Sequence, residues 1–218
     1  MTRVKALRID WYSAYDYEQF RKAVSEKKRL RIDRLKNRED YQKSLLGDDL
    51  ARNMVGEITS IPSKDLIIDV DEDGKPFIVN ASGIYFNVSH SGDWVVCVVS
   101  DKQCGIDVEK ISDIDIKVAE RFFTQSEYAI LKEKESHERK NLFFEFWTIK
   151  ESYIKYIGQG LGIPLNSFEI VMKNNKYAIK SDVEKTCNVE IIDFDPEYKM
   201  AISYMDDQYK IDYSKHNL

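Results

Sequence analysis

Residues 138–157 read ERKNLFFEFWTIKESYIKYI, and this stretch predicts the longest helix of the chain. Its apolar residues recur every three or four positions, which places them on one face of a helix. That face carries Leu142, Phe146, Ile149, Tyr153 and Ile157. Gly158 and Gly160 follow at once, as is typical of a helix end. We therefore expect an amphipathic helix whose apolar face packs into a core.

Short β-type runs lie on both sides of this helix. They cover residues 66–70, 84–88, 94–100 and 103–109 before it, and 168–172, 177–180, 189–194, 200–204 and 209–213 after it. Two further helices are expected at 44–54 and 124–134. Helices and strands are grouped rather than strictly alternating, which favours the α+β class. A soft boundary near 101–103 predicts two subdomains, 1–103 and 104–218.

Composition excludes several classes of protein. The chain has 218 residues and a net charge of −5. Its longest apolar run, residues 94–99, is far too short to span a membrane. No apolar signal core follows the N-terminus, and the three cysteines form no CxxC pair. We expect a cytoplasmic protein without a membrane segment, a disulfide framework or a zinc cluster.

A basic segment at residues 21–38 contrasts with the acidic remainder. It holds nine Lys and Arg residues against two acidic ones. Lys28, Arg31, Arg34 and Arg38 have the spacing of one helical face. Such a face on an acidic protein suits a small polyanion, such as a nucleotide, better than a nucleic acid. A solvated helix face is the alternative, and this feature alone does not decide between them.

Two carboxylates alternate on the predicted strand Gly105-Ile106-Asp107-Val108-Glu109. Residues i and i+2 of a strand share a face, so Asp107 and Glu109 point the same way. Their oxygens suit Mg²⁺, which would also relieve the repulsion between them. An exposed strand face at a sheet edge would give the same pattern.

Glu151 and Lys155 lie four residues apart on the long helix, away from its apolar face. A surface ion pair is the simple interpretation of this spacing. The functional interpretation makes Glu151 a third metal carboxylate and Lys155 a phosphate ligand. Thr124 to Glu127 has the form of a capping box, which predicts a helix start.

Small polar residues follow the predicted strand 84–88. Ser89 and His90 would be hydrogen-bond donors to a phosphate at the strand end, or residues of a turn. Gly74-Lys75-Pro76 could likewise be a turn and nothing more.

Together these motifs resemble the 4′-phosphopantetheinyl transferases. The resemblance rests on G-I-D-V-E at 105–109, F-x-x-x-E at 123–127 and W-T-I-K-E-S-x-x-K-x-x-G-x-G-L at 147–161. Residues 74–76, residues 87–91 and the basic segment point to the surfactin-synthetase-activating (Sfp) type. The similarity runs from about residue 26 to residue 168. Gln159 stands where many members carry Lys or Arg.

The resemblance implies a fold and an activity. Members look like two fused copies of a shorter synthase, so we expect a pseudo-twofold pair of similar subdomains, each a small antiparallel sheet packed with a long helix. They transfer the phosphopantetheine arm of coenzyme A, the co-substrate, to a serine of an apo peptidyl or acyl carrier protein, releasing adenosine 3′,5′-bisphosphate. The N-terminal subdomain is expected to bind the nucleotide, and the C-terminal one to hold the metal and catalytic residues.

It also implies roles for the candidate residues. Asp107, Glu109 and Glu151 would bind Mg²⁺ or Mn²⁺, and Lys155 would contact phosphate. Glu127 or Glu151 would be the base, although a purely structural capping role for Glu127 is a serious alternative. The predicted coenzyme A ligands are Lys28, Arg31, Ser44, Lys75, Pro76, Ser89, His90 and Lys155. Ser44 is also favoured as the start of the helix 44–54, where an anion would be stabilised.

The implied partner is an acidic carrier protein, expected to dock on residues 111–124. We expect a monomer, because both halves lie in one chain, and no nucleic-acid partner. A metal-dependent phosphohydrolase or nuclease is one alternative, although the net charge is negative. A non-catalytic module that binds coenzyme A or a carrier protein is the other, although all three carboxylates and Lys155 are present.

Overall fold

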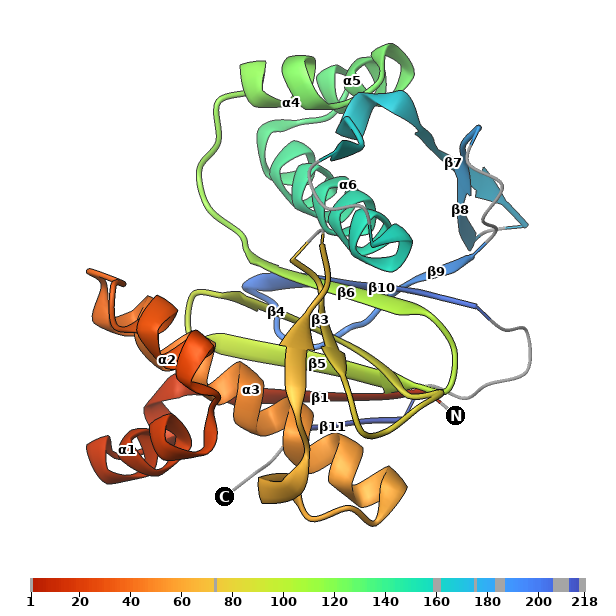
Figure 1. Cartoon of the computed structure of the whole chain (residues 1–218). Helices are drawn as coiled ribbons and strands as arrows, with labels where there is room; N and C mark the ends of the chain where they lie inside the picture. The colour runs from red at the N-terminus through yellow and green to blue at the C-terminus, as the bar shows by residue number, and fades with distance from the viewer. Residues whose placement is uncertain are drawn as a thin grey trace. The chain divides into compact units, whose positions relative to one another are not determined.

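A computed structural model describes residues 2–72, 74–158, 162–174, 176–182, 187–205 and 212–215 (Figure 1). The chain divides into two compact units. The N-terminal unit is Met1–Gln103 with Tyr209–Leu218, and the C-terminal unit is Cys104–Gln208. The second unit therefore ends earlier than the expected range 104–218, because a strand from the end of the chain pairs inside the first unit.

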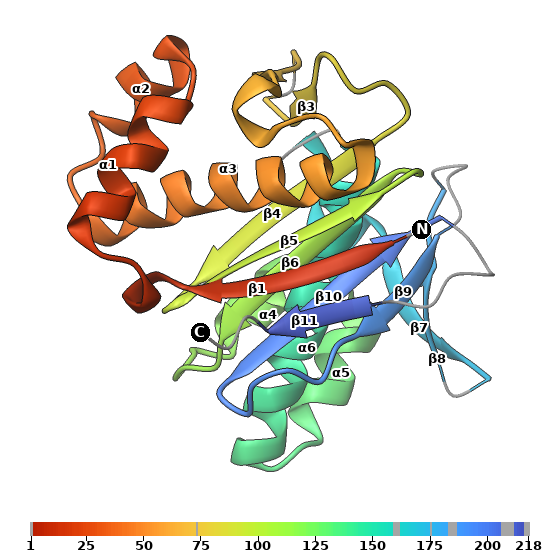
Figure 2. The same ribbon diagram turned by 90° about the horizontal axis from the view of Figure 1, so that it is seen from below.

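The N-terminal unit is built on a four-stranded sheet. Its strands are β1 (Arg3–Arg8), β4 (Tyr85–Ser91), β5 (Trp94–Ser100) and β11 (Asp212–Lys215), in the order β11-β1-β5-β4. β1, β5 and β4 are antiparallel, while β11 runs parallel to β1. The 22-residue helix α3 (Arg38–Thr59) lies across this sheet, as Figure 2 shows.

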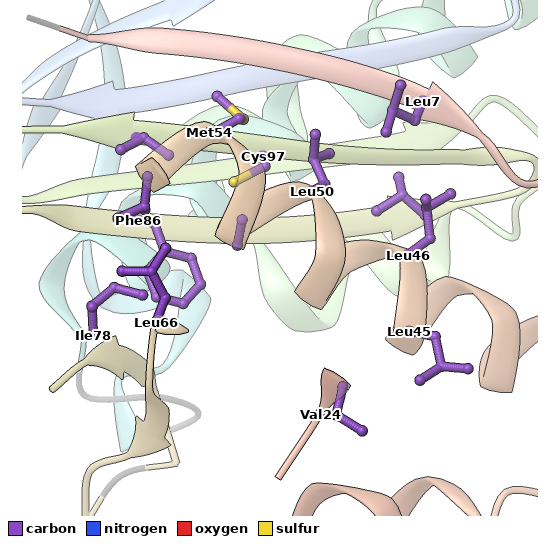
Figure 3. Packing of buried hydrophobic residues seen from close by; sticks show 14 of the residues in the cluster. Leu7, Val24, Leu45, Leu46, Leu50, Met54, Leu66, Ile78, Phe86 and Cys97 are labelled. Carbon is purple, nitrogen blue, oxygen red and sulfur yellow. The ribbon is translucent and has the colours of Figure 1, made fainter. Parts of the chain in front are cut away.

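Smaller elements complete this unit. They are η1 (Ile9–Trp11), α1 (Ala14–Ala23), α2 (Glu26–Ile32), η2 (Ser63–Asp65) and the hairpin of β2 (Ile68–Val70) and β3 (Pro76–Ile78). The core forms where α3 meets the sheet, and Leu46, Leu50 and Met54 are each at most 2% exposed. Figure 3 shows these side chains packed with Phe86 and Cys97.

Helix α3 is longer than the predicted helix 44–54. It begins after Asn37, whose side chain accepts a hydrogen bond from the backbone of Glu39. It ends at Ser60, which adopts a left-handed conformation with φ of 60°. Both ends are polar, so the apolar periodicity identified only the buried middle of the helix.

The C-terminal unit repeats this plan with an antiparallel sheet. β6 (Cys104–Lys110), β10 (Tyr198–Tyr204) and β9 (Asn188–Ile191) lie in the order β6-β10-β9. The 22-residue helix α6 (Ser136–Ile157) packs on β6 and β10. The remaining elements are α4 (Lys117–Phe122), α5 (Gln125–Lys132), η4 (Leu165–Ser167) and the hairpin of β7 (Glu169–Lys173) and β8 (Lys176–Lys180).

The long helix agrees with the sequence prediction. Ile149, Tyr153 and Ile157 are at most 3% exposed and Phe146 is also buried, so the predicted apolar face is buried except at Leu142, which is partly buried. Gly158 ends the helix with a left-handed φ of 83°, which suits glycine because it has no Cβ.

The backbones of β6 and α6 touch at Gly105. A Cβ atom at this position would overlap the carbonyl oxygen of Ser152 and the amide nitrogen of Tyr156. The face of β6 that carries Gly105 therefore faces α6. Because strand residues alternate, Asp107 and Glu109 lie on that same face.

These observations confirm the α+β class. Each unit contains antiparallel strands, one 22-residue helix and a separate two-stranded hairpin, as expected for similar subdomains. The twofold relation between them stays a prediction. Cys97 and Cys104 are buried and form no disulfide. In the described part of the chain, every helix is too short or too polar to cross a bilayer.

Candidate functional site

The C-terminal unit brings together three of the predicted residues. Asp107 of β6 is 3% exposed, and its Oδ1 lies 2.6 Å from Nζ of Lys155 on α6. Glu151 lies one helical turn before Lys155 and is partly buried. Burial and the negative charge of Asp107 raise the pKa of Glu151, whereas Lys155 opposes that shift. Two carboxylates and one ammonium thus share a partly buried site between a strand and a helix, which we call the acidic site.

The donors of the acidic site suit a hard cation. The negative charge of Asp107 acts on Glu151, and Glu109 adds a third carboxylate on the same face of β6. Carboxylate oxygens are the ligands that Mg²⁺ prefers. Within the described ranges, no three His, Cys, Asp or Glu side chains are already arranged around a metal position. The chemistry of the three carboxylates fits a divalent cation, and Asp107 is paired with Lys155.

Glu127 has a structural role in this unit. Its Oε2 accepts a hydrogen bond from the backbone of Thr124 at 2.8 Å, which completes the predicted capping box of α5. Its Oε1 accepts from the backbone of Ile170 at 2.7 Å and lies 2.9 Å from Nζ of Lys150. Glu127 is 1% exposed, so it could act as a base only after leaving these contacts.

Lys150 is the buried partner of Glu127 and was not among the predicted site residues. It is fully buried, and its Nζ also donates to the carbonyl oxygens of Leu165 and Phe168 at 2.8 and 2.7 Å. Burial lowers the pKa of Lys150, and Glu127 opposes this shift. The Glu127–Lys150 pair therefore joins α5, α6 and the segment around η4.

The N-terminal unit contains a cavity of about 130 Å³ between α2 and the hairpin β2–β3. Its lining includes three predicted nucleotide ligands, Lys28, Arg31 and Pro76. The full lining is Ser25, Lys27, Lys28, Arg31, Ile68, Asp69, Val70, Gly74 and Pro76. Asp69 pairs with Lys27 at 3.5 Å, which leaves Lys28 and Arg31 as the cations for an anion, and Ile68 and Val70 suit an attached apolar or aromatic group. We call this space the basic cavity.

The predicted basic helical face is wrong. Lys28 and Arg31 belong to α2, which ends at Ile32, whereas Arg34 lies in the following turn and Arg38 begins α3. The spacing was correct for one helix, but the chain turns before Arg34, so only the first two residues meet at the cavity.

Ser44 does not begin a helix. It lies in the second turn of α3, one turn before Asp48 and on the same helical face. The argument that a helix N-terminus would stabilise an anion at Ser44 is therefore wrong, since α3 begins at Arg38. Lys75 lies in the turn of the hairpin, where its backbone nitrogen donates to Asp71.

Ser89 and His90 lie within β4 and not beyond its end. β4 continues to Ser91, and Ser89 and His90 pair with Val96 and Val95 of β5. Successive strand residues face opposite sides of the sheet, so these two side chains point apart. Ser89 is 7% exposed, whereas His90 is exposed. The sequence prediction ended the strand too early because polar residues continue its pairing.

The segment predicted to dock a carrier protein has a mixed surface. Residues 111–124 include α4, in which Ala119 is buried and Lys117 and Arg121 are exposed. Asp113 forms an ion pair with Lys140 at 2.5 Å. Exposed positive charges on α4 are compatible with an acidic partner. Residues 159–161 of the third motif, including Gln159, lie outside the described residues.

Comparisons with known proteins agree with this arrangement. A family described as the "4'-phosphopantetheinyl transferase superfamily" matches residues 103–211, and one described as "4'-phosphopantetheinyl transferase, N-terminal" matches residues 10–102. The 4'-phosphopantetheinyl transferase Sfp of Bacillus subtilis (strain 168) is 35% identical over 87% of this chain and 86% of its own.

Two further proteins are similar to this chain. The 4'-phosphopantetheinyl transferase gsp of Aneurinibacillus migulanus is 47% identical over 67% of this chain and 61% of its own. A solved holo-(acyl-carrier-protein) synthase from Bacillus anthracis str. Ames, in complex with CoA (3',5'-ADP), is 21% identical with a TM-score of 0.43. That match covers 47% of this chain and 93% of the solved one.

Proposed function

Because the chain belongs to the 4′-phosphopantetheinyl transferase superfamily, we propose that it transfers the 4′-phosphopantetheine group of coenzyme A to a serine of an apo carrier protein. The serine hydroxyl oxygen forms a bond to the phosphorus next to pantetheine. The diphosphate bond breaks, adenosine 3′,5′-bisphosphate leaves, and the serine proton passes to a base. The observation that best supports this function is the acidic site of Asp107, Glu151 and Lys155.

We infer that Asp107, Glu109 and Glu151 hold Mg²⁺, with Mn²⁺ as an alternative because oxygen ligands suit both. The bound cation would neutralise charge on the diphosphate oxygens. Lys155 adds a positive charge at the same place, because its ammonium lies 2.6 Å from Asp107. Diphosphate cleavage needs positive charge at this place, because the leaving bisphosphate gains negative charge as its bond breaks.

Glu151 is our candidate for the base. It is partly buried at the acidic site, and the serine proton would reach it directly or through a water that the bound metal orders. Glu127 was the other candidate. Its two oxygens are occupied by backbone amides and by Lys150, which supports a structural role.

We infer that the basic cavity takes a phosphate and the adjoining nucleoside of coenzyme A. Lys28 and Arg31 would contact the phosphate, and Pro76 would pack along the nucleoside. Roles for Ser44, Lys75, Ser89 and His90 in this binding stay predictions. The N-terminal unit would thus bind the nucleotide, and the C-terminal unit would hold the metal and catalytic residues.

For the partner, we infer an acidic peptidyl or acyl carrier protein that docks on residues 111–124 through exposed Lys117 and Arg121. Reversing both charges should raise KM for the carrier protein and leave KM for coenzyme A unchanged. If the charge-reversed variant and the wild type have equal KM values for the carrier protein, the carrier docks on another surface. A monomeric state and a cytoplasmic location stay predictions.

Mass spectrometry of an apo carrier protein incubated with this protein, coenzyme A and Mg²⁺ tests the function. We expect the mass of one phosphopantetheine group to be added, and EDTA to prevent the addition. Glu151→Gln should slow transfer by about 100-fold or more, as loss of a general base does. Glu138→Gln is the matched control, because Glu138 lies on the same helix with a 66% exposed side chain.

Each alternative function has its own outcome in this experiment. Coenzyme A binding without an adduct on several carriers would indicate a binding module. Release of adenosine 3′,5′-bisphosphate without a carrier would indicate a phosphohydrolase. An adduct formed at the normal rate by Glu151→Gln would keep the function and exclude Glu151 as the base.

A further inference from the structure

A buried carboxylate lies behind one cationic wall of the basic cavity. Asp48 of α3 is 4% exposed, and its Oδ1 accepts a hydrogen bond from Nζ of Lys28 at 2.7 Å. Its Oδ2 accepts from Nε of Arg52, one turn later on the same helix, at 2.5 Å. Arg52 also donates to the carbonyl oxygen of Leu66. Both oxygens of Asp48 are therefore paired with cations.

The two cations bound by Asp48 differ in what they can reach. Arg52 is 5% exposed and is not among the described residues that line the cavity. Lys28 lines the cavity, and its side chain is 26% exposed. An ammonium has three hydrogens, and Asp48 takes one of them, so two can serve an anion in the cavity. Of the three linked residues Lys28, Asp48 and Arg52, only Lys28 therefore reaches the cavity, and Arg52 is buried.

Without Asp48, the position of Lys28 would be unfavourable. Burial is the main cause that lowers the pKa of Lys28, and the positive charges of Arg31 and Arg52 add to this effect. The Asp48 carboxylate acts in the opposite direction, through its charge and through the hydrogen bond. Loss of the carboxylate would leave the repulsion from Arg31 and Arg52 unopposed, and the flexible stem of Lys28 would let its ammonium turn to solvent.

We propose that Asp48, held by Arg52, is a positioning residue of the nucleotide site that fixes the Lys28 ammonium against the cavity, where it receives a phosphate of coenzyme A. This inference rests on the proposed function. Asp48 itself does not touch the nucleotide, because both of its oxygens are engaged behind the cavity.

The direction in which anion affinity changes when Asp48 loses its charge distinguishes a positioning role from a purely electrostatic one. Removal of a negative charge near an anion site should tighten anion binding if charge alone mattered. A positioning role predicts weaker binding, because the hydrogen-bond donor moves away. An ion pair that only stabilises the fold would lower the melting temperature and leave the affinity of the folded protein unchanged.

The experiment measures binding of adenosine 3′,5′-bisphosphate by calorimetry and steady-state kinetics with coenzyme A. For Asp48→Asn we expect affinity to fall about tenfold, as for one misplaced hydrogen bond to a charged group. KM for coenzyme A should rise by a similar factor, while kcat changes less than about twofold. Asp49→Asn is the matched control on the same helix, and its affinity should equal that of the wild type. Unchanged or tighter binding by folded Asp48→Asn would overturn the proposal.

Two further variants keep the test decisive. If Asp48→Asn does not fold, because Arg52 loses its partner, Asp48→Glu keeps the charge but displaces the oxygens by one methylene group. We expect weaker binding for Asp48→Glu, and wild-type affinity would overturn the proposal. In a Lys28→Met background, Asp48→Asn should weaken binding no further, since Lys28 is the group being positioned. Additive losses in that background would also overturn it.

Failure of this inference can be told apart from failure of the proposed function. A wild-type protein that neither binds the bisphosphate nor modifies a carrier contradicts the proposed function, and this inference with it. A wild-type protein that does both, with Asp48 variants that match it, contradicts only the role of Asp48.

Discussion

At the scale of single residues, Glu127 and Lys150 form a buried ion pair with exposed side-chain fractions of 1% and 0%. Glu127→Gln would leave the Lys150 ammonium buried with only carbonyl partners. We expect this to lower the free energy of unfolding by about 3–5 kcal/mol. If Glu127 only supports the fold, adding Lys150→Met should recover part of the lost melting temperature and of the lost transfer rate, because the carbonyl oxygens of Leu165 and Phe168 still lose their donor. A double variant that folds normally but stays inactive would instead make Glu127 catalytic.

Asp49 gives a pH-dependent prediction at the same scale. Burial, with the neighbouring charge of Asp48, raises the pKa of Asp49 to about 6, above the usual value of about 3.9 for an aspartate. The folded state therefore holds this proton more tightly than the unfolded state does, and stability falls as pH rises between these values. Asp49→Asn should raise the free energy of unfolding at pH 7 by about 1–3 kcal/mol and have little effect near pH 4. Urea titrations at both pH values would measure this difference, and an equal effect at both would contradict it.

At the scale of elements, contact between β6 and α6 depends on Gly105. Gly105→Ala would force the backbones apart, since the new methyl group would overlap main-chain atoms of α6. We expect the free energy of unfolding to fall by about 1–3 kcal/mol or more. Transfer should also be slower, because Asp107 and Lys155 lie on the two separated elements. Gly162→Ala is the control, because nothing lies within 4 Å of its added Cβ. Thermal melts and transfer rates should distinguish Gly105→Ala from Gly162→Ala. Equal melting temperatures and equal rates for both variants would mean that α6 can shift without loss of stability.

At the scale of the whole molecule, the C-terminal strand β11 completes the first unit of the chain. β11 pairs in parallel with β1, with Arg3 opposite Asp212 and Ala6 opposite Lys215. Removal of residues 206–218 would make β1 an edge strand with unpaired backbone groups. We expect faster hydrogen exchange in residues 3–8 and more aggregation, with exchange in α6 unchanged. Unaltered protection of β1 against hydrogen exchange would show that its pairing with β11 contributes little to the stability of the sheet.

The sequence by itself determined the features that repeat over short distances. The period of three to four residues located α6, alternation located β6, and the spacing from Thr124 to Glu127 located a helix start. The motifs at 105–109, 123–127 and 147–161, taken together, pointed to the family. These signals are local because hydrogen bonds and side-chain directions within one element follow sequence spacing.

Only the tertiary structure decided which distant groups meet. It placed Lys155 against Asp107, 48 residues away, and Lys28 against Asp48, 20 residues away. The i, i+4 spacing of Asp48 and Arg52 was readable as an ion pair, but nothing local showed that both would be buried behind a cavity. It also moved Ser44 into a helix interior and Ser89 into a paired strand. Polar residues at the ends of elements have no period of their own, so packing and backbone pairing decide where those elements stop.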